Sequence, residues 1–194
     1  MKVLDAIRSD REQARARDDP NAGLCFLALA DTNGNASVRT LVLREVAENR
    51  FRVFVNETSP KWRLFVEGAG CELLLWYPSV QRQYRISGEL RALDAEIVRA
   101  HWHRRPAGSK YLDQVYAELA QSTAITSRAV LTDEIARLQR EHPEEELQPP
   151  ESAAGLELIA NRIEALDLSY EDRIHARQLH RFDGEAWTSE VLVP

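Results

Sequence analysis

Basic side chains on strand-like segments are the feature of this sequence that most suggests ligand chemistry. Arg39 and Arg44 lie in the otherwise apolar segment SVRTLVLR, and a second segment, RIHAR, alternates Arg173, His175 and Arg177. A strand would place these three alternating side chains on one face of a sheet. Adjacent cations repel one another unless an anionic ligand or cross-strand carboxylates compensate them. Both interpretations remain open at this point.

Further polar residues lie at the predicted junctions between elements. Ser59 has the character of a helix N-cap, because Pro60 follows at the first helical position and Lys61 comes next. A helix N-terminus beside a Lys or Arg is a natural phosphate site. The other members of this group are Gln83 on a strand, Arg105 and Ser109 around a proline, and Gln121 and Ser122 after a helix. These residues alone predict a phosphorylated, planar ligand bound on a barrel.

The sequence lacks the motifs of several common phosphate-binding, hydrolase and metal sites. It has no Gly-rich phosphate loop, no G-x-S-x-G nucleophile elbow and no Cys/His cluster with metal-ligand spacing. His101 and His103 are two residues apart on a predicted helix and point to different faces, which argues against a shared zinc ion. Cys25 and Cys71 each lie in an apolar run, as expected of buried free thiols in a reducing compartment. We therefore expect no metal site.

The composition narrows the class of protein further. The chain has 194 residues, 44% of them hydrophobic, and 25 Lys and Arg against 31 Asp and Glu give a net charge of −6. An acidic chain is a poor general nucleic-acid binder, because affinity for a duplex comes largely from phosphate neutralisation. No apolar run approaches the ~20 residues that span a bilayer, and the first residues do not resemble a secretory signal. We expect a cytoplasmic protein with neither a nucleic-acid nor a membrane partner.

The hydrophobic pattern predicts an α+β fold built on an antiparallel barrel. The predicted strands are Gly23–Ala30, Ser37–Arg44, Phe51–Val55, Cys71–Tyr77, Gln81–Leu90, Leu156–Leu166, Arg173–Phe182 and Trp187–Val193. The predicted helices are Val3–Arg17, a short one after Ser59, Asp94–Arg104, Ser109–Leu119 and Thr132–Glu141. The strands on either side of the helical insertion must close one sheet, since neither set has enough partners alone. We expect a single domain over residues 1–194, with an N-terminal helix within 1–19 and an internal loop at 142–155.

The surfaces of three predicted elements indicate what covers them. The strands GLCFLALA and CELLLWY are apolar on both faces, which implies more covered surface than one small barrel provides. We therefore expect a homodimer. The arginines of the N-terminal helix alternate with acidic residues, which favours a solvated face over a nucleic-acid patch. These arginines are Arg8, Arg11, Arg15 and Arg17.

The order of several motifs resembles the pyridoxamine 5'-phosphate oxidase family of flavin-binding split-barrel enzymes. These motifs are RTLVLR (39–44), FVNETSPK (54–61), RQYRISG (82–88), HWHRRPAGS (101–109), QSTAITSR (121–128), RIHAR (173–177) and the final W…LVP. The resemblance runs from about Gly23 to the C-terminus, and the six motifs that precede the final W…LVP, in the family's order, are hard to obtain by chance. It implies an FMN-binding split barrel with peripheral helices, and a homodimer with FMN in clefts at the subunit interface.

The resemblance also implies roles for particular residues. The implied cofactor-binding residues are Arg39, Ser59 and Lys61 near the FMN phosphate, and Gln83, Gln121, Ser122 and Arg177 near the rest of the flavin. Implied substrate-binding residues are Arg44, His101, Arg105 and Ser109, around the phosphate of a vitamin B6 compound. Arg173 and His175 are the implied catalytic residues, next to the pyridine ring. The implied reaction oxidises pyridoxamine or pyridoxine 5'-phosphate to pyridoxal 5'-phosphate, with O₂ as acceptor and hydrogen peroxide as product.

The sequence departs from the family pattern at four positions. Pro60 replaces a cation near the flavin phosphate, and Arg44 replaces a lysine, which keeps the charge but changes its geometry. His101 stands where the family has a substrate-binding tyrosine, and Asp167 falls where it has a flavin-contacting tryptophan. Two alternatives therefore remain beside the B6 oxidase. One is an FMN-dependent oxidoreductase with a different substrate, and the other is a non-catalytic flavin-binding protein.

Overall fold

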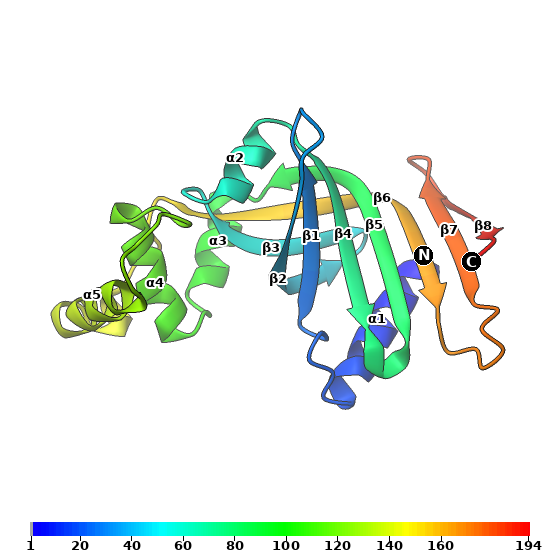
Figure 1. Ribbon diagram of the computed structural model, residues 1–194, viewed down its shortest axis with the longest axis horizontal. Helices are drawn as coiled ribbons and strands as arrows, with labels where there is room; N and C mark the ends of the chain where they lie inside the picture. Colours follow the sequence, from blue (N-terminus) through cyan, green and yellow to red (C-terminus); the bar gives the residue numbers. More distant parts are fainter. Residues whose placement is uncertain (1) are drawn as a thin grey trace. The chain divides into compact units, whose positions relative to one another are not determined.

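The computed structural model describes residues 2–194 and contains an eight-stranded sheet in the order β3-β2-β1-β4-β5-β6-β7-β8. An additional pairing of β3 with β6 closes the first six strands into a barrel, and β7 and β8 extend the sheet beyond it (Figure 1). The strands are β1 (Leu24–Ala30), β2 (Ala36–Ala47), β3 (Arg50–Asn56), β4 (Gly70–Tyr77), β5 (Arg82–Ala92), β6 (Ala153–Asp167), β7 (Ala176–Phe182) and β8 (Trp187–Leu192). The predicted α+β fold with an antiparallel split barrel is confirmed.

Alternation of buried and half-buried side chains builds the barrel interior. The buried residues of three adjacent strands are Cys25, Leu27 and Leu29 in β1, Leu73, Leu75 and Tyr77 in β4, and Tyr84 and Ile86 in β5. Their strand register places them side by side, so one continuous apolar face points inward. On the opposite face of β1, Phe26 and Ala28 are only partly buried. The apolar sequence of β1 predicts burial on both faces, but within one chain only the face that points into the barrel is fully buried.

Gly88 in β5 allows this strand to approach β6 closely. A Cβ atom at this position would lie 2.0 Å from the carbonyl oxygen of Ile159 and 2.9 Å from Cα of Ala160. Backbone atoms cannot give way as the end of a flexible side chain can. Any side chain larger than hydrogen would therefore separate the two strands.

The chain forms two compact units. The first combines the chain up to Val53 with Gly68–Arg91 and Glu157–Pro194, and the second combines Phe54–Glu67 with Ala92–Leu156. Strands β3 and β6 contribute residues to both units. The expectation of a single domain over residues 1–194 stays a prediction.

Helix α1 (Lys2–Ala16) belongs to the first unit and packs next to β4. It buries an apolar stripe that includes Ile7 and Ala14, together with the guanidinium of Arg11. Arg11 donates from Nε to the carbonyl oxygen of Ala22 at 3.0 Å and from Nη2 to that of Leu43 at 2.5 Å. Burial lowers the pKa of Arg11. The prediction that Arg11 lies on a solvated face is therefore wrong, because two carbonyl oxygens replace water around its charge.

The second unit contains most of the helices. They are α2 (Pro60–Val66), α3 (Ala95–Trp102), α4 (Ala107–Glu118), α5 (Arg128–Glu141) and the short 3₁₀ helix η2 (Glu144–Glu146), whereas the 3₁₀ helix η1 (Pro78–Val80) lies in the first unit. Trp102, Tyr111 and Leu147 form the buried cluster that holds α3, α4 and the segment after α5 together. None of the helices within residues 2–194 is long and apolar enough to cross a membrane.

Several boundaries differ from the predicted ones by two to four residues. Helix α5 begins at Arg128 rather than Thr132, α4 at Ala107 rather than Ser109, and β6 at Ala153 rather than Leu156. The predicted loop at 142–155 is therefore shorter and carries one 3₁₀ turn. Element ends are set by local backbone bonds rather than by apolar periodicity, which explains why the pattern misplaced them.

Candidate active site

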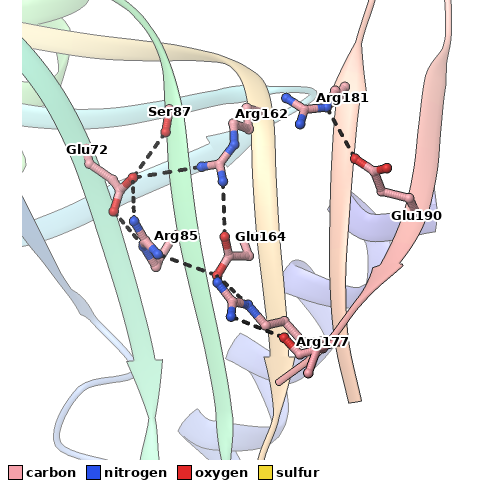
Figure 2. Close-up of polar contacts among 9 residues, drawn as sticks. Glu72, Arg85, Ser87, Arg162, Glu164, Arg177, Arg181 and Glu190 are labelled. Carbon is pink, nitrogen blue, oxygen red and sulfur yellow. Dashed lines mark hydrogen bonds and ion pairs between the residues drawn. The ribbon is translucent and has the colours of Figure 1, made fainter. Parts of the chain in front are cut away.

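Five charged residues form a connected network on strands β4 to β7 of the first unit (Figure 2). Glu164 Oε1 accepts from Nε and Nη2 of Arg177 at 2.9 and 2.8 Å. Its Oε2 accepts from Arg162 Nη2 at 3.0 Å, and Arg85 Nη1 lies 3.5 Å from Oε1. Glu72 accepts from Arg85 Nε at 2.7 Å. Three guanidinium groups and two carboxylates leave one positive charge in excess at this face.

The structure places only one of the three alternating basic residues on a strand. Strand β7 begins one residue before Arg177, so Arg173 and His175 lie in the preceding loop. Arg173 has φ = 62°, in the left-handed region, and Asp172 Oδ1 accepts from the Ile174 backbone N–H at 2.9 Å. Such local side-chain bonds compete with strand pairing. The prediction that the three side chains share one face of a strand is therefore wrong. Of the three, Arg177 is the one that pairs with a carboxylate on a neighbouring strand, Glu164.

The loop that carries Arg173 and His175 borders a pocket of ≈ 650 Å³. Trp76 and Gln81 also line this pocket, and both belong to the first unit. His175 Nδ1 is buried and has no hydrogen-bond partner within residues 2–194. Buried polar atoms are nearly always paired, so an unpaired imidazole nitrogen marks a position for a ligand or a water molecule. The two predicted catalytic residues are thus brought to one pocket, although not by a strand.

Arg39 and Gln83 lie on opposite faces of the sheet. Arg39 is paired in register with the buried Leu27 and donates to its carbonyl oxygen at 3.3 Å, and burial lowers the pKa of this guanidinium. Gln83 borders a ≈ 220 Å³ pocket on the other face, where Phe26 is also found. Arg44 is exposed, beside an irregularity in the pairing of β2 with β3. The structure therefore does not place these three predicted ligand residues on one surface of a single chain.

The second unit brings together predicted cofactor residues that are far apart in sequence. Ser59 is 1% exposed and caps α2, and its Oγ accepts from the Trp62 backbone N–H at 3.4 Å. Lys61 Nζ, in the first turn of this helix, donates to Gln121 Oε1 at 2.6 Å. Ser122 follows with φ = 74° and is exposed. A cation, an amide and two hydroxyl groups thus gather around the start of α2 and residues 121–122.

Arg105 has a carboxylate partner that sequence reasoning missed. Its Nη1 donates to Asp113 Oδ2 at 2.5 Å, and Trp102 Nε1 donates to the same oxygen at 2.8 Å. Asp113 is 3% exposed, and burial raises the pKa of its carboxyl group against the opposing influence of these two donors. Arg105 Nε is buried and has no partner within the described part of the chain. The guanidinium is thus oriented and neutralised at one edge, while its other edge retains an unused donor.

The two remaining predicted substrate residues also lie in the second unit. His101, near the end of α3, stacks on Phe54 with ring centroids 4.9 Å apart. Ser109 lies in the first turn of α4, and its backbone N–H donates to the carbonyl oxygen of Pro106 at 2.9 Å. Both side chains are half-buried. Stacking on Phe54 restricts the orientation of the His101 ring, whose two nitrogen atoms can make polar contacts.

Two buried acidic residues, Glu164 and Asp113, are the site features that the sequence reasoning missed. Each interrupts an apolar pattern: Glu164 lies in the strand segment RIEAL and Asp113 in the helix segment YLDQVY. The available signal was a single acidic residue on an element whose neighbours are buried, because such a residue needs a cationic partner. The sequence does not say which arginine that partner is. Among residues 2–194, no group of three or more His, Cys, Asp or Glu is arranged to hold a metal ion.

Comparison with known proteins agrees with the resemblance carried by the motifs. The family model for pyridoxamine 5'-phosphate oxidase matches residues 12–141. A pyridoxine/pyridoxamine 5'-phosphate oxidase of Pseudomonas paraeruginosa is 30% identical over 190 residues, which cover 98% of this chain and 84% of that protein. The protein of the same name from Erythrobacter litoralis is 31% identical over 189 residues and covers 94% and 86%, respectively.

Two solved structures have the same fold at lower sequence identity. PhzG from Burkholderia lata, in complex with tetrahydrophenazine-1-carboxylic acid, has a TM-score of 0.83 and 22% identity, covering 94% of this chain and 88% of that one. A pyridoxamine 5'-phosphate oxidase-related, FMN-binding protein from Nostoc punctiforme has a TM-score of 0.78 and 20% identity, covering 97% and 95%. From the family match and the relatives that are at least 30% identical, the chain belongs to the pyridoxamine 5'-phosphate oxidase family.

Proposed function

We propose that this protein is an FMN-dependent oxidase that converts pyridoxamine or pyridoxine 5'-phosphate to pyridoxal 5'-phosphate, with O₂ as acceptor and hydrogen peroxide as product. The names of its relatives at about 30% identity support the oxidoreductase class and this substrate. The observation that carries the proposal is the pocket bordered by Arg173 and His175, together with the buried Nδ1 of His175, which has no partner within residues 2–194. A polar aromatic substrate would supply that partner.

The residue types suit FMN. The family resemblance assigns the FMN phosphate to Arg39 in the first unit and to Lys61 and Ser59 in the second, and the two cations match the charge of a phosphate dianion. The Ser59 hydroxyl is buried and donates to the carbonyl oxygen of Asn56 at 2.6 Å. Gln83, Gln121, Ser122 and Arg177 would meet the ring and the ribityl chain, and the largely apolar pocket beside Gln83 is suited to a planar ring. Bound FMN would supply the hydride acceptor for C4' of the substrate and pass the electrons to O₂. The charged network at Arg177 has one positive charge in excess, which favours an anionic or electron-rich ligand.

The substrate side of the proposal follows the residue roles that the family resemblance implies. Arg44, Arg105, Ser109 and His101 would bind the substrate phosphate, and Arg173 and His175 would orient the pyridine ring. Arg173 and His175 can stabilise charge that develops in the transition state, and His175 can donate or accept a hydrogen bond at Nδ1. Asp113 already neutralises one edge of Arg105, so this arginine would bind a phosphate less tightly than an unpaired guanidinium does.

A homodimer with FMN at the subunit interface is part of this proposal. The face of β1 and β2 that points away from the barrel interior exposes Val38 at 67% and Val42 at 45%, and Phe26 is only half-buried there. A second copy that covers this face would also bring further residues to Gln83. Sedimentation tests the prediction, since a single species of the 22.1 kDa monomer at micromolar concentration would contradict it. We also propose a cytoplasmic location, which the two free thiols Cys25 and Cys71 support.

A second candidate function keeps FMN but changes the substrate. His101 and Asp167 depart from the family pattern at a substrate position and a flavin position, respectively. Arg105 follows the pattern, but its charge is already compensated by Asp113. The structure of PhzG was solved with a carboxylic acid rather than a phosphate ester. An FMN-dependent oxidoreductase of a non-phosphorylated planar acid is therefore the alternative, and a non-catalytic flavin-binding protein is a third.

One purified sample distinguishes these candidates. Flavin absorbance after incubation with FMN, followed by hydrogen peroxide release on addition of pyridoxamine 5'-phosphate, supports the B6 oxidase. Flavin uptake with peroxide release only from a planar carboxylic acid supports the second candidate. Flavin uptake without turnover of either compound supports the third. A protein that does not take up FMN contradicts all three.

A further inference from the structure

Glu164 contacts three arginines in the charged network of Figure 2, whereas Glu72 contacts two. Only 4% of this residue is exposed, although it carries a charge, and it lies near the C-terminal end of β6. A buried carboxylate is stable only when donors surround it, and three arginines surround Glu164. The donors come from three adjacent strands, since Arg85 lies in β5, Arg162 in β6 itself and Arg177 in β7.

The contacts of Arg177 differ from those of the other two arginines. Arg177 donates twice to one oxygen of Glu164, from Nε at 2.9 Å and Nη2 at 2.8 Å, whereas Arg162 makes one such contact at 3.0 Å. Two bonds from one edge of a planar guanidinium fix both its position and its orientation. The third nitrogen, Nη1, lies 3.4 Å from the carbonyl oxygen of Val193. Arg177 keeps 31% of its side chain exposed, so a ligand can still reach the guanidinium.

We propose that Glu164 is a positioning residue, which holds the Arg177 guanidinium in the orientation that contacts bound flavin. This role rests on the proposed function, which gives Arg177 to the cofactor. Glu164 itself contacts the arginines and not the flavin. Glu72 has a different part, because it binds Arg85 and not Arg177. Arg85 Nε lies 2.7 Å from Glu72, whereas its Nη1 lies 3.5 Å from the Glu164 oxygen that Arg177 contacts at 2.8 and 2.9 Å, so Arg177 has the closer contact.

The test measures FMN affinity by fluorescence titration in a double-mutant cycle of Glu164→Gln and Arg177→Ala. Glu164→Gln preserves the size of the side chain but removes its charge, so we expect FMN to bind about tenfold more weakly. Arg177→Ala should weaken binding at least as much. In the Arg177→Ala background, Glu164→Gln should have little further effect, because it acts through the arginine that is already absent. A role in folding alone would give independent, additive losses.

Two further variants keep the test decisive. Glu164→Asp retains the buried charge that folding needs but withdraws it by one methylene group, and it should also weaken FMN binding. The matched control is Glu190→Gln in the exposed pair of Glu190 with Arg181, where both side chains are 58% exposed, and it should leave FMN affinity unchanged. Circular dichroism on each variant verifies that the affinities refer to folded protein.

The possible failures are distinguishable. If the wild type binds FMN and Arg177→Ala weakens it, but both Glu164 variants bind normally, the positioning role is wrong and the proposed function stands. Additive losses in the cycle also overturn the positioning role. If the wild type does not bind FMN, the proposed function fails and the role of Glu164 fails with it.

Discussion

Glu164 in the first unit and Asp113 in the second are both carboxylates buried beside arginine, and their surroundings differ. Glu164 in the first unit accepts from three arginines, which share only one further carboxylate, Glu72. Asp113 in the second unit accepts from one arginine and one indole N–H. The first arrangement has a positive charge in excess, while the second is neutral. A buried carboxylate beside arginine therefore leaves positive charge for a ligand in the first unit, whereas the charges cancel in the second.

The difference has a functional meaning under the proposed function. An excess positive charge next to half-exposed guanidiniums favours tight retention of the cofactor. A neutral pair of Arg105 with Asp113 favours orientation of the arginine over attraction of an anion. We therefore expect variants of the first unit to change flavin content or turnover. Variants at Asp113 should chiefly change stability and the selectivity for a phosphate.

The largest expected effect is the loss of stability in Asp113→Ala. This change leaves the Arg105 guanidinium and the Trp102 indole N–H without their acceptor, and breaking a buried pair in this way costs about 3–5 kcal/mol. Urea unfolding measures the free energy of unfolding. The matched control, Asp133→Ala on the exposed face of α5, should change it by no more than ~0.5 kcal/mol. A loss at Asp113 no larger than the control's would contradict the comparison.

The second-largest expected effect distinguishes the roles of Arg173 and Arg177, which both lie in the first unit. Arg173→Ala should lower kcat/KM for pyridoxamine 5'-phosphate by about 10²–10³, or ~2–4 kcal/mol, and leave the FMN content nearly intact. Arg177→Ala should instead yield protein depleted of flavin. Absorbance of the purified variants and a peroxide assay on FMN-loaded samples give both quantities. Wild-type turnover in Arg173→Ala would remove the B6 oxidase and leave the broader flavoprotein function.

A smaller effect concerns the phosphate of the cofactor. If Arg39 and Lys61 bind this phosphate, FMN should bind about tenfold or more tightly than riboflavin, because charge-assisted hydrogen bonds are lost with the phosphate. Parallel titrations of the two flavins measure the ratio. Equal affinities would show that neither cation serves the phosphate.

The smallest expected effect is a pH dependence of the free energy of unfolding that comes from Asp113. Its native pKa is raised by burial, so the folded state binds the proton more tightly than the unfolded state does. This contribution to stability is present below the usual carboxyl pKa of about 3.9, and it is lost as the pH rises through the native value. Asp113→Asn lacks this titration. The stability difference between wild type and Asp113→Asn should therefore shrink as the pH rises through this window, and a difference that grows would show that burial does not raise this pKa.

Much of the fold could be predicted because hydrophobic alternation reports directly on burial. Strand β4 was predicted from Cys71 to Tyr77 and begins only one residue earlier. The segment RIHAR alternates equally well but is not a strand before residue 176, since the Asp172 carboxylate and the left-handed Arg173 stop the pairing. A period-two pattern contains no information about such local bonds. The same limit explains why α5 begins four residues before its predicted start.

The candidate site was predictable only as a set of residue types. The motifs identified Lys61 and Gln121, and the structure brings these two side chains within 2.6 Å of each other although they are 60 residues apart. The sequence could not show that Arg105 and Arg177 have buried carboxylate partners. That information depends on tertiary pairing, since an acidic residue in an apolar segment, such as Glu164, signals a need for a cationic partner without identifying it.

The most direct test of the proposed function is a single turnover without oxygen. FMN-loaded protein is mixed anaerobically with pyridoxamine 5'-phosphate, and the visible absorbance of the flavin is followed. We predict that the absorbance falls as the substrate is oxidised, that it returns when air is admitted, and that pyridoxal 5'-phosphate is formed. An absorbance that stays unchanged with excess pyridoxamine and pyridoxine 5'-phosphates would contradict the proposed function.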